Sequence, residues 1–366
     1  MVDRIPSASK YAQLVADMKM NEFNFNKLTA QLSSGKNIVE LSDDPIASVN
    51  ILNTTKQLGQ LETFEQNVGM ASAELTALDD LLDLANGYLS EAWNRAIQAN
   101  NQTYNAGSLE ALKVEIDEIT KTMVDLANSK YNDNYIFSGA NTKTAAYSID
   151  EDGNIEYHGT PSTNPDYVRK TEVADGVFEV INTTGDKLFG HYEKIQETDA
   201  NGNKVFLDAA GNKVYENAQN NPKTYVYDDG SAYTGNVEDL KKSYTDQESY
   251  SGVMGALKKL SNSIQKVLDG NTVEGYEEMN STLDMFASSQ TDILGEQTRF
   301  AGVYNRLEMT SSTLETNNQN LTSYLSQIQD VDYASAITQW MNAQYAYQAS
   351  MQVASASMNM SLLNYM

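Results

Sequence analysis

Cysteine is absent from this chain of 366 residues, so disulfides, thiolate metal sites and cysteine nucleophiles are excluded. Proline is rare, and residues 46–158 and 223–366 contain none, so both stretches are free to form long helices. No run approaches the ~18 apolar residues of a membrane-spanning helix. The first residues also lack the apolar segment and cleavage site of a secretory signal, so we expect any export to occur without cleavage.

Positive charge is scarce as well. The chain has 25 basic and 50 acidic residues, which gives a formal net charge of −25. Phosphate backbones and anionic membrane surfaces would repel such a chain, which argues against nucleic acid and membrane as partners. After Arg306 there is neither lysine nor arginine. A long helix with so few charges is a poor solvent-facing surface, so we expect the last ~35 residues to become ordered only within an assembly.

What the sequence does contain is, above all, a seven-residue apolar repeat. Residues 7–34 carry two such series, interrupted by Asn21, and the helix they predict ends at Gly35. A last helical stretch is expected beyond a break near residues 330–332. Because each of these terminal segments has an incomplete seam, we predict that they face other copies of the chain. The predicted subunit-interface residues are Tyr11, Leu14, Met18, Phe25, Leu28, Leu32, Ile337, Met341, Tyr345, Ala349, Leu362 and Leu363.

Two longer repeats predict the core of a helical rod. One helix is expected from Pro45, capped by Asp43 or Asp44, to about residue 100. Its partner carries a repeat that begins at Met279 and continues to Ile328. Shorter helices are expected from a cap at Ser108 and from about residue 251. The predicted rod-core residues are Leu61, Val68, Leu75, Leu82, Leu89, Met279, Phe286, Ile293, Phe300, Leu307 and Leu314.

The middle of the chain, residues 141–250, has a different composition. Heptads vanish, and short alternating runs separated by Gly, Asn and Asp predict β-hairpins, for example around residues 151–154. A nine-residue unit occurs twice, as DANGNKVFL (199–207) and DAAGNKVYE (208–216). We expect each copy to form a type I′ turn and a strand. The alternative is a calcium loop, although neither copy has the downstream Glu of an EF-hand.

The sequence shows no constellation for catalysis. His158 and His191 are the two histidines, and we interpret them as surface residues rather than as metal ligands. No nucleophile elbow, phosphate-binding loop or zinc-protease motif occurs. The 22 tyrosines could form a carbohydrate-binding surface, but strand propensity explains them equally well. We therefore predict a structural protein without a cofactor or metal, not an enzyme.

Several segments resemble signatures of the bacterial flagellin superfamily. LSSGK (32–36) and DDP (43–45) are similar to its N-terminal signature, and AGVYNRLE (301–308) and LSQIQDVDYA (325–334) to its C-terminal one. Within this family, YIFSGANT (135–142) resembles the hook-associated proteins of the hook–filament junction. VADGV (173–177) and GDKLFG (185–190) fit their variable domain.

The resemblance implies a fold and a function. It implies a mainly α, flagellin-like antiparallel helical rod with coiled-coil termini and a β-rich inserted domain. The expected parts are assembly segments (1–40 with 330–366), a rod domain (41–140 with 251–329) and an outer domain (141–250). It also implies a structural ring subunit of the flagellum, secreted through the type III export apparatus. Its partners would be further copies, a neighbouring hook-associated protein, filament flagellin and an export chaperone bound to the C-terminal helix.

Three alternatives stay open. The chain could be a filament flagellin, although residues 135–142 and the ending LLNYM favour the junction. Residues 141–250 could instead carry a surface adhesin. An enzymatic insertion in that region lacks any nucleophile–base pair to support it.

Overall fold

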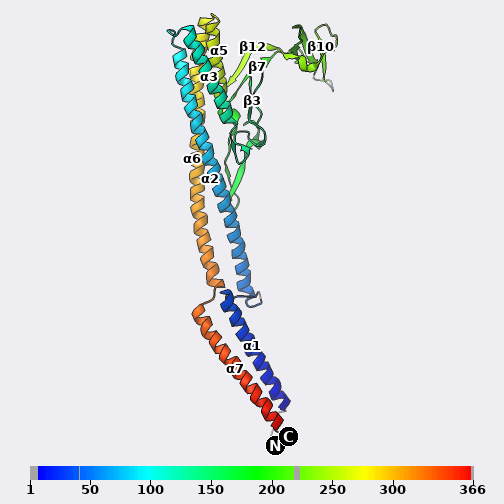
Figure 1. The fold of residues 1–366 in the computed structure, drawn as a ribbon, viewed down its shortest axis with the longest axis vertical. Coiled ribbons are helices and arrows are strands. Elements are labelled where there is room, and N and C mark those ends of the chain that lie inside the picture. Colours follow the sequence, from blue (N-terminus) through cyan, green and yellow to red (C-terminus); the bar gives the residue numbers. More distant parts are fainter. Residues whose placement is uncertain (1–6, 41, 218–222, 364–366) are drawn as a thin grey trace. The chain divides into compact units, whose positions relative to one another are not determined.

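The computed structural model describes residues 7–40, 42–217 and 223–363 (Figure 1). The chain divides into two compact units, residues 1–66 with 311–366 and residues 67–310. Two long helices, α2 (Pro45–Ala99) and α6 (Thr272–Gln329), contribute to both units. The proline-free stretches therefore form long helices, as the sequence predicts.

The first unit is helical. It contains α1 (Ser7–Ser34), α7 (Tyr333–Leu363), the beginning of α2 and the end of α6. Asp44 caps α2, because its Oδ1 accepts hydrogen bonds from the amides of Ile46 and Ala47, both at 3.0 Å. Asp332 caps α7 in the same way through the amides of residues 334 and 335. The predicted cap at residues 43–44 and the predicted break near residue 330 are both confirmed.

The second unit contains the rest of α2 and α6 together with α3 (Ala106–Ala127) and α5 (Gly252–Leu268). The predicted cap at Ser108 is wrong. Asn105 is the N-cap, and its side chain accepts a hydrogen bond from the Ser108 amide at 2.9 Å. Asn and Ser cap helices equally well, so the two candidates could not be separated by residue type. Asp269 and Gly270 end α5, as predicted.

Twelve strands lie between Lys130 and Ser251 in the described ranges. They form two four-stranded antiparallel sheets, ordered β12-β7-β4-β3 and β10-β9-β8-β11, and two hairpins, β1-β2 and β5-β6. The strands are β1 (Lys130–Tyr131), β2 (Asn134–Tyr135), β3 (Tyr147–Ile149), β4 (Ile155–Tyr157), β5 (Lys170–Ala174), β6 (Val177–Val180), β7 (His191–Gln196), β8 (Lys204–Leu207), β9 (Lys213–Asn217), β10 (Thr224–Tyr227), β11 (Lys241–Lys242) and β12 (Tyr244–Ser251). The predicted hairpin across residues 151–154 is the β3–β4 pair. A short helix, α4 (Gly185–Leu188), follows β6.

The repeated DANGN and DAAGN units form hairpin turns, but not of type I′. In each turn one residue, Gly202 or Gly211, has a positive φ, of +80° and +84°. Type I′ turns need two such residues, so these are type I turns followed by a left-handed glycine. The Asp199 and Asp208 carboxylates fix this geometry by accepting two backbone amides and one asparagine side chain each. A local side-chain hydrogen bond therefore selects the turn.

Candidate assembly surface

The N-terminal and C-terminal signature segments meet at one corner of the first unit. The amide of Asn37 donates to the carbonyl of Gln329 at 2.7 Å, and the amide of Val331 donates to the carbonyl of Gly35 at 3.0 Å. Gly35 has a φ of +70°, and a Cβ there would lie 2.8 Å from the hydroxyl of Tyr333. The corner therefore requires glycine both for its backbone conformation and for the space beside Tyr333.

The loop between α1 and α2 is fixed to α1 by a charge pair. Lys27 Nζ lies 2.7 Å from Asp43 Oδ1, and Asp43 Oδ2 accepts the amides of Val39 and Glu40. The hydrogen bond from Lys27 holds the pKa of the Asp43 carboxyl below its usual value. The two acids of the signature thus act locally: Asp43 holds the loop and Asp44 caps the next helix.

α1 and α7 pack against each other in antiparallel directions. Phe25 stacks on Tyr347, with ring centroids 6.0 Å apart, and also contacts Trp340 at 5.7 Å. The indole Nε1 of Trp340 donates to the hydroxyl of Thr29 at 2.9 Å. The terminal helices of one chain therefore pack against each other.

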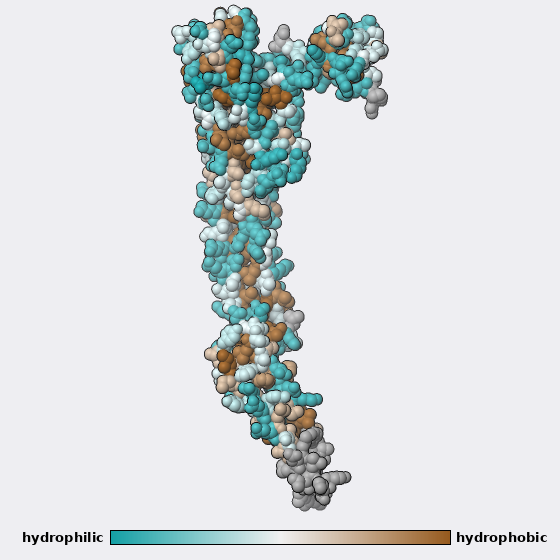
Figure 2. Space-filling model, viewed as in Figure 1, coloured by the Kyte–Doolittle hydropathy of each residue, from teal (hydrophilic) through white to brown (hydrophobic). Residues whose placement is uncertain are grey.

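A second stripe of α7 is left exposed beside this contact. The exposed fractions of Ile337, Met341 and Tyr345 are 46%, 44% and 62%. Their spacing of four residues places them on one face of the helix. From residue 333 to the end, the sequence contains no charged residue at all. Figure 2 shows that apolar side chains also reach the surface in patches along the helical parts of the chain. An uncharged helix with an exposed apolar stripe is the kind of surface that another protein covers.

Further exposed apolar residues of the same unit lie on α1 and on the first turns of α2. Met20 and Phe23 lie on α1, and Ile46, Val49 and Leu52 follow each other at intervals of three on α2. The heptad pattern marks neither group, because the series of α1 excludes Met20 and Phe23 and the series of α2 begins only at Leu61.

The structure separates the predicted interface residues into two groups. Those on α1 (Leu14, Met18, Phe25, Leu28 and Leu32) are half-buried, and α7 of the same chain is the helix that α1 contacts. Those on α7 (Ile337, Met341, Tyr345 and Ala349) are exposed. The side chains of Tyr11, Leu362 and Leu363 lie outside the described residues. The assignment of both groups to contacts between copies stays a prediction.

Most predicted rod-core residues are buried. Leu61 is half-buried, whereas the others are at most 4% exposed: Val68, Leu75, Leu82, Leu89, Met279, Phe286, Ile293, Phe300, Leu307 and Leu314. In the second unit, polar contacts link the same two helices, for example Gln290 to Asn86 at 3.2 Å.

Residues 135–142 begin at the end of β2 and lie on the connection to β3. Phe137 is fully buried and meets the ring of Phe189 edge-on at 5.0 Å. Its carbonyl accepts the amide of Gly185 and the hydroxyl of Tyr157. Gly139 has a φ of +68°, with Thr160 directly beside it. The motif that resembles junction proteins thus has a structural role.

The polar residues considered for chemistry do not converge. His158 and His191 each approach a serine hydroxyl, Ser148 at 2.6 Å and Ser249 at 3.5 Å. The Asp199 and Asp208 carboxylates are occupied by their own turns. Within the described ranges, no group of three His, Cys, Asp or Glu side chains could hold a metal ion. None of the helices in those ranges combines the length and hydropathy that a bilayer crossing requires.

Comparison with known proteins places the chain in a family. Residues 6–142 match the bacterial flagellin N-terminal helical region, and residues 283–366 match the flagellin C-terminal helical region. The chain belongs to the flagellin family. Its corner at Gly35 and Tyr333 lies where these two matched regions meet.

Within this family, the chain is similar to hook-associated proteins. It is 26% identical over 187 residues to flagellar hook-associated protein 3 of Escherichia coli, which is 51% of this chain and 56% of that protein. The chain thus spans little more than half the length of this relative. A flagellin of Clostridium tyrobutyricum is 22% identical over 356 residues, covering 88% of this chain and 90% of that one. The crystal structure of hook-associated protein 3 from Legionella pneumophila shares the fold, with a TM-score of 0.55, 18% identity and coverage of 76% and 98%.

Proposed function

We propose that this protein is a structural subunit of the bacterial flagellum that forms the junction between hook and filament. The observation that carries the proposal is the pairing of α1 with an uncharged α7 whose Ile337, Met341 and Tyr345 remain exposed. Burying such a stripe against another subunit is favourable by about 25 cal/mol per Å² of apolar surface. The similarity to hook-associated protein 3 supports the junction in particular.

The remaining features of the proposal follow from the family. We propose that the chain is exported without cleavage through the type III apparatus and is not an enzyme. Its partners would be further copies, a neighbouring hook-associated protein and filament flagellin, with an export chaperone on the C-terminal helix before assembly. Residues 1–40 and 330–366 would serve assembly, residues 41–140 and 251–329 would form the rod, and residues 141–250 would face outward.

A strain that lacks the gene tests this function. We expect it to retain hooks, to lose filament subunits to the medium and to be non-motile, and we expect the intact gene to restore all three properties. A gene truncated before residue 333 should not restore them, although its product should still fold. Normal filaments in the deletion strain would contradict the proposal.

A filament flagellin is the second candidate, because the Clostridium tyrobutyricum flagellin matches over almost its whole length. Immunogold labelling of isolated flagella separates the two. Label confined to the hook–filament boundary supports the junction, whereas label along the filament supports a flagellin.

A further inference from the structure

A polar pocket of about 290 Å³ lies between α5 and the β12-β7-β4-β3 sheet. Its walls include Tyr192 and Lys194 of β7, Glu248 of β12, and Lys258 and Asn262 of α5. Asp152, in the β3–β4 turn, forms part of its rim. The flagellar role proposed above leaves this pocket unused.

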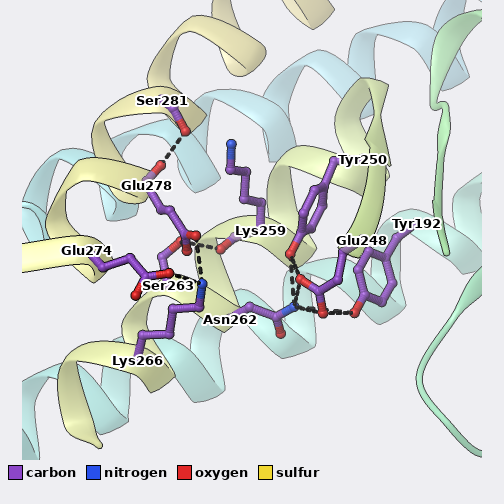
Figure 3. Close-up of polar contacts among 10 residues, drawn as sticks. All are labelled: Tyr192, Glu248, Tyr250, Lys259, Asn262, Ser263, Lys266, Glu274, Glu278 and Ser281. Carbon is purple, nitrogen blue, oxygen red and sulfur yellow. Dashed lines mark hydrogen bonds and ion pairs between the residues drawn. The ribbon is translucent and has the colours of Figure 1, made fainter. Parts of the chain in front are cut away.

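The acidic groups of the pocket already have partners. Figure 3 shows Glu248 between Tyr192, Tyr250 and Asn262: Tyr192 Oη donates to Glu248 Oε1 at 2.8 Å, Tyr250 Oη donates to Oε2, and Asn262 Nδ2 lies 3.4 Å from both oxygens. Burial raises the pKa of both phenols, so they remain protonated donors. Asp152 Oδ2 accepts the hydroxyl of Tyr244 at 2.8 Å. Both carboxylates therefore already accept hydrogen bonds from side chains of the protein.

The basic groups are different. Within the described residues, neither Lys194 nor Lys258 has a carboxylate at ion-pair distance. Lys194 Nζ donates to the carbonyl of Asp152 at 3.0 Å, and Lys258 Nζ lies 3.2 Å from the position that a Cβ on Gly153 would occupy. The two ammonium groups thus converge on the same turn. By contrast, Lys266 is paired with Glu274 and Glu278.

Lys258 differs from a solvated surface lysine because it is partly buried. Lys258 is half-buried over the ring of Tyr192, with Nζ 5.6 Å from the ring centroid. Burial lowers the pKa of Lys258; the charges of Asp117 and Glu248 oppose this effect, and those of Lys113 and Lys194 add to it. An anionic group between Lys194 and Lys258 would place a negative charge in direct contact with both ammonium groups, which none of the carboxylates in the described residues does.

We propose that this pocket binds a monoanionic, hydroxyl-bearing ligand of the uronic-acid class, with its carboxylate between Lys194 and Lys258. Asn262 and Gln265 line the same pocket. Their amide nitrogens are engaged by Glu248 and by Asp269, and their amide oxygens can accept hydrogen bonds from sugar hydroxyls. A polyanion fits less well, because the net charge of −25 and the nearby Glu248 and Asp152 repel further negative charge.

Saturation-transfer difference NMR on the full-length protein tests the proposal, with glucuronate, glucose and inorganic sulfate as separate probes. We expect glucuronate to bind and glucose to bind at least tenfold more weakly. Lys258→Gln should weaken glucuronate binding at least tenfold, and Lys194→Gln should weaken it in the same direction. Lys259→Gln is the matched control: it removes the same charge from the next residue of α5, whose ammonium lies over Tyr250 outside the pocket, and should change affinity less than twofold.

Four outcomes would overturn the proposal: no binding of glucuronate, glucose binding as tightly as glucuronate, binding of sulfate but not of glucuronate, and equal losses of glucuronate affinity in Lys258→Gln and Lys259→Gln. Circular dichroism of each variant shows whether α5 and the sheet are retained. If Lys258→Gln does not fold, Lys194→Gln provides the same comparison from the other side of the pocket.

Discussion

Arg306 holds Glu179 in a two-pronged ion pair. Its Nε donates to Oε1 at 2.7 Å and its Nη2 donates to Oε2 at 2.6 Å, so the guanidinium matches both carboxylate oxygens. Seven residues earlier on the same face of α6, Arg299 donates to the carbonyl of Asn182 at 2.9 Å. On the other side, Asn67 of α2 donates to the carbonyl of Glu172. The β5–β6 hairpin is thus anchored to both long helices.

Replacing Arg306 with Gln should loosen this hairpin. The pair is partly exposed to solvent, so we expect a loss of up to about 1 kcal/mol in the free energy of unfolding. Faster amide hydrogen exchange in β5 and β6, compared with β3 and β4, would identify the site of the change. Glu179→Gln should have the same effect, and the double variant should lose no more than either single variant. Additive losses would show that the two residues act independently.

The same pair predicts a dependence on pH. The hydrogen bond from Arg306 lowers the pKa of Glu179 below its ordinary value of 4.5. A carboxyl whose pKa is lower in the folded state stabilises the fold above the ordinary pKa, and this contribution disappears as the pH falls through the folded value. Urea denaturation should therefore separate wild type from Arg306→Gln at neutral pH and not at a pH well below 4.5. A constant difference at all pH values would exclude the ion pair as its cause.

The heptad repeats of α2 and α6 predicted the core correctly because a seven-residue period shows which face of a helix is buried, whichever helix packs against it. Leu82 and Phe286 are buried where a strict seven-residue repeat places them, and Asp44 caps the helix that Pro45 begins. The fold class and the hairpin positions follow from the same periodicities and turn residues.

What the sequence did not show depends on contacts between distant segments. Arg299 and Arg306 read as ordinary surface charges until the hairpin is placed beside them. The α1 series was expected to face other copies, yet Phe25 packs on Tyr347 of the same chain. An apolar stripe in the sequence predicts that the helix face is covered, but it does not identify the segment or subunit that covers it. Lys258 likewise became notable only when its neighbours were known.

Gly35→Ala should destabilise the corner at which Gly35 lies beside Tyr333. An alanine at a φ of +70° costs roughly 1–2 kcal/mol, and its Cβ would also displace the Tyr333 hydroxyl. Thermal unfolding followed by circular dichroism measures the loss. In the double variant, Tyr333→Phe should relieve the contact with the new Cβ and leave the backbone cost.

Gly59→Ala is the control, since Gly59 lies within α2 with open space around it. That change should stabilise the helix by up to about 1 kcal/mol. Equal effects of the two glycine changes would show that the corner does not require glycine.

Leu82→Ala should destabilise the second unit strongly. Leu82 is fully buried, and removing a buried leucine side chain typically costs about 2–5 kcal/mol through lost burial and the cavity left behind. Two residues further along α2, Leu84 is 53% exposed. Leu84→Ala should change the free energy of unfolding by about 0.5 kcal/mol or less. Urea denaturation of both variants measures the difference. Similar losses would show that the heptad does not mark the core.

Two neighbouring residues of α7 separate folding from assembly. Trp340 contacts Phe25 and Thr29 of α1, so Trp340→Ala should lower the thermal stability of the first unit. Met341, the next residue along the helix, is 44% exposed. A lysine in its place should therefore cost the fold little. Met341→Lys should therefore unfold at the wild-type temperature. Against an apolar partner surface, however, it would bury an unpaired charge, which costs several kcal/mol.

Met341→Lys should consequently fail to restore filament growth in the deletion strain while it is still exported to the medium. Electron microscopy of the cells and immunoblots of the medium give the two measurements. Met341→Leu, which keeps the apolar surface, should restore growth. If Met341→Lys supports normal filaments, the exposed stripe of α7 is not an assembly contact. If it accumulates inside the cell, the defect lies in export, and a purified subunit added to bare hooks then shows whether assembly itself is intact.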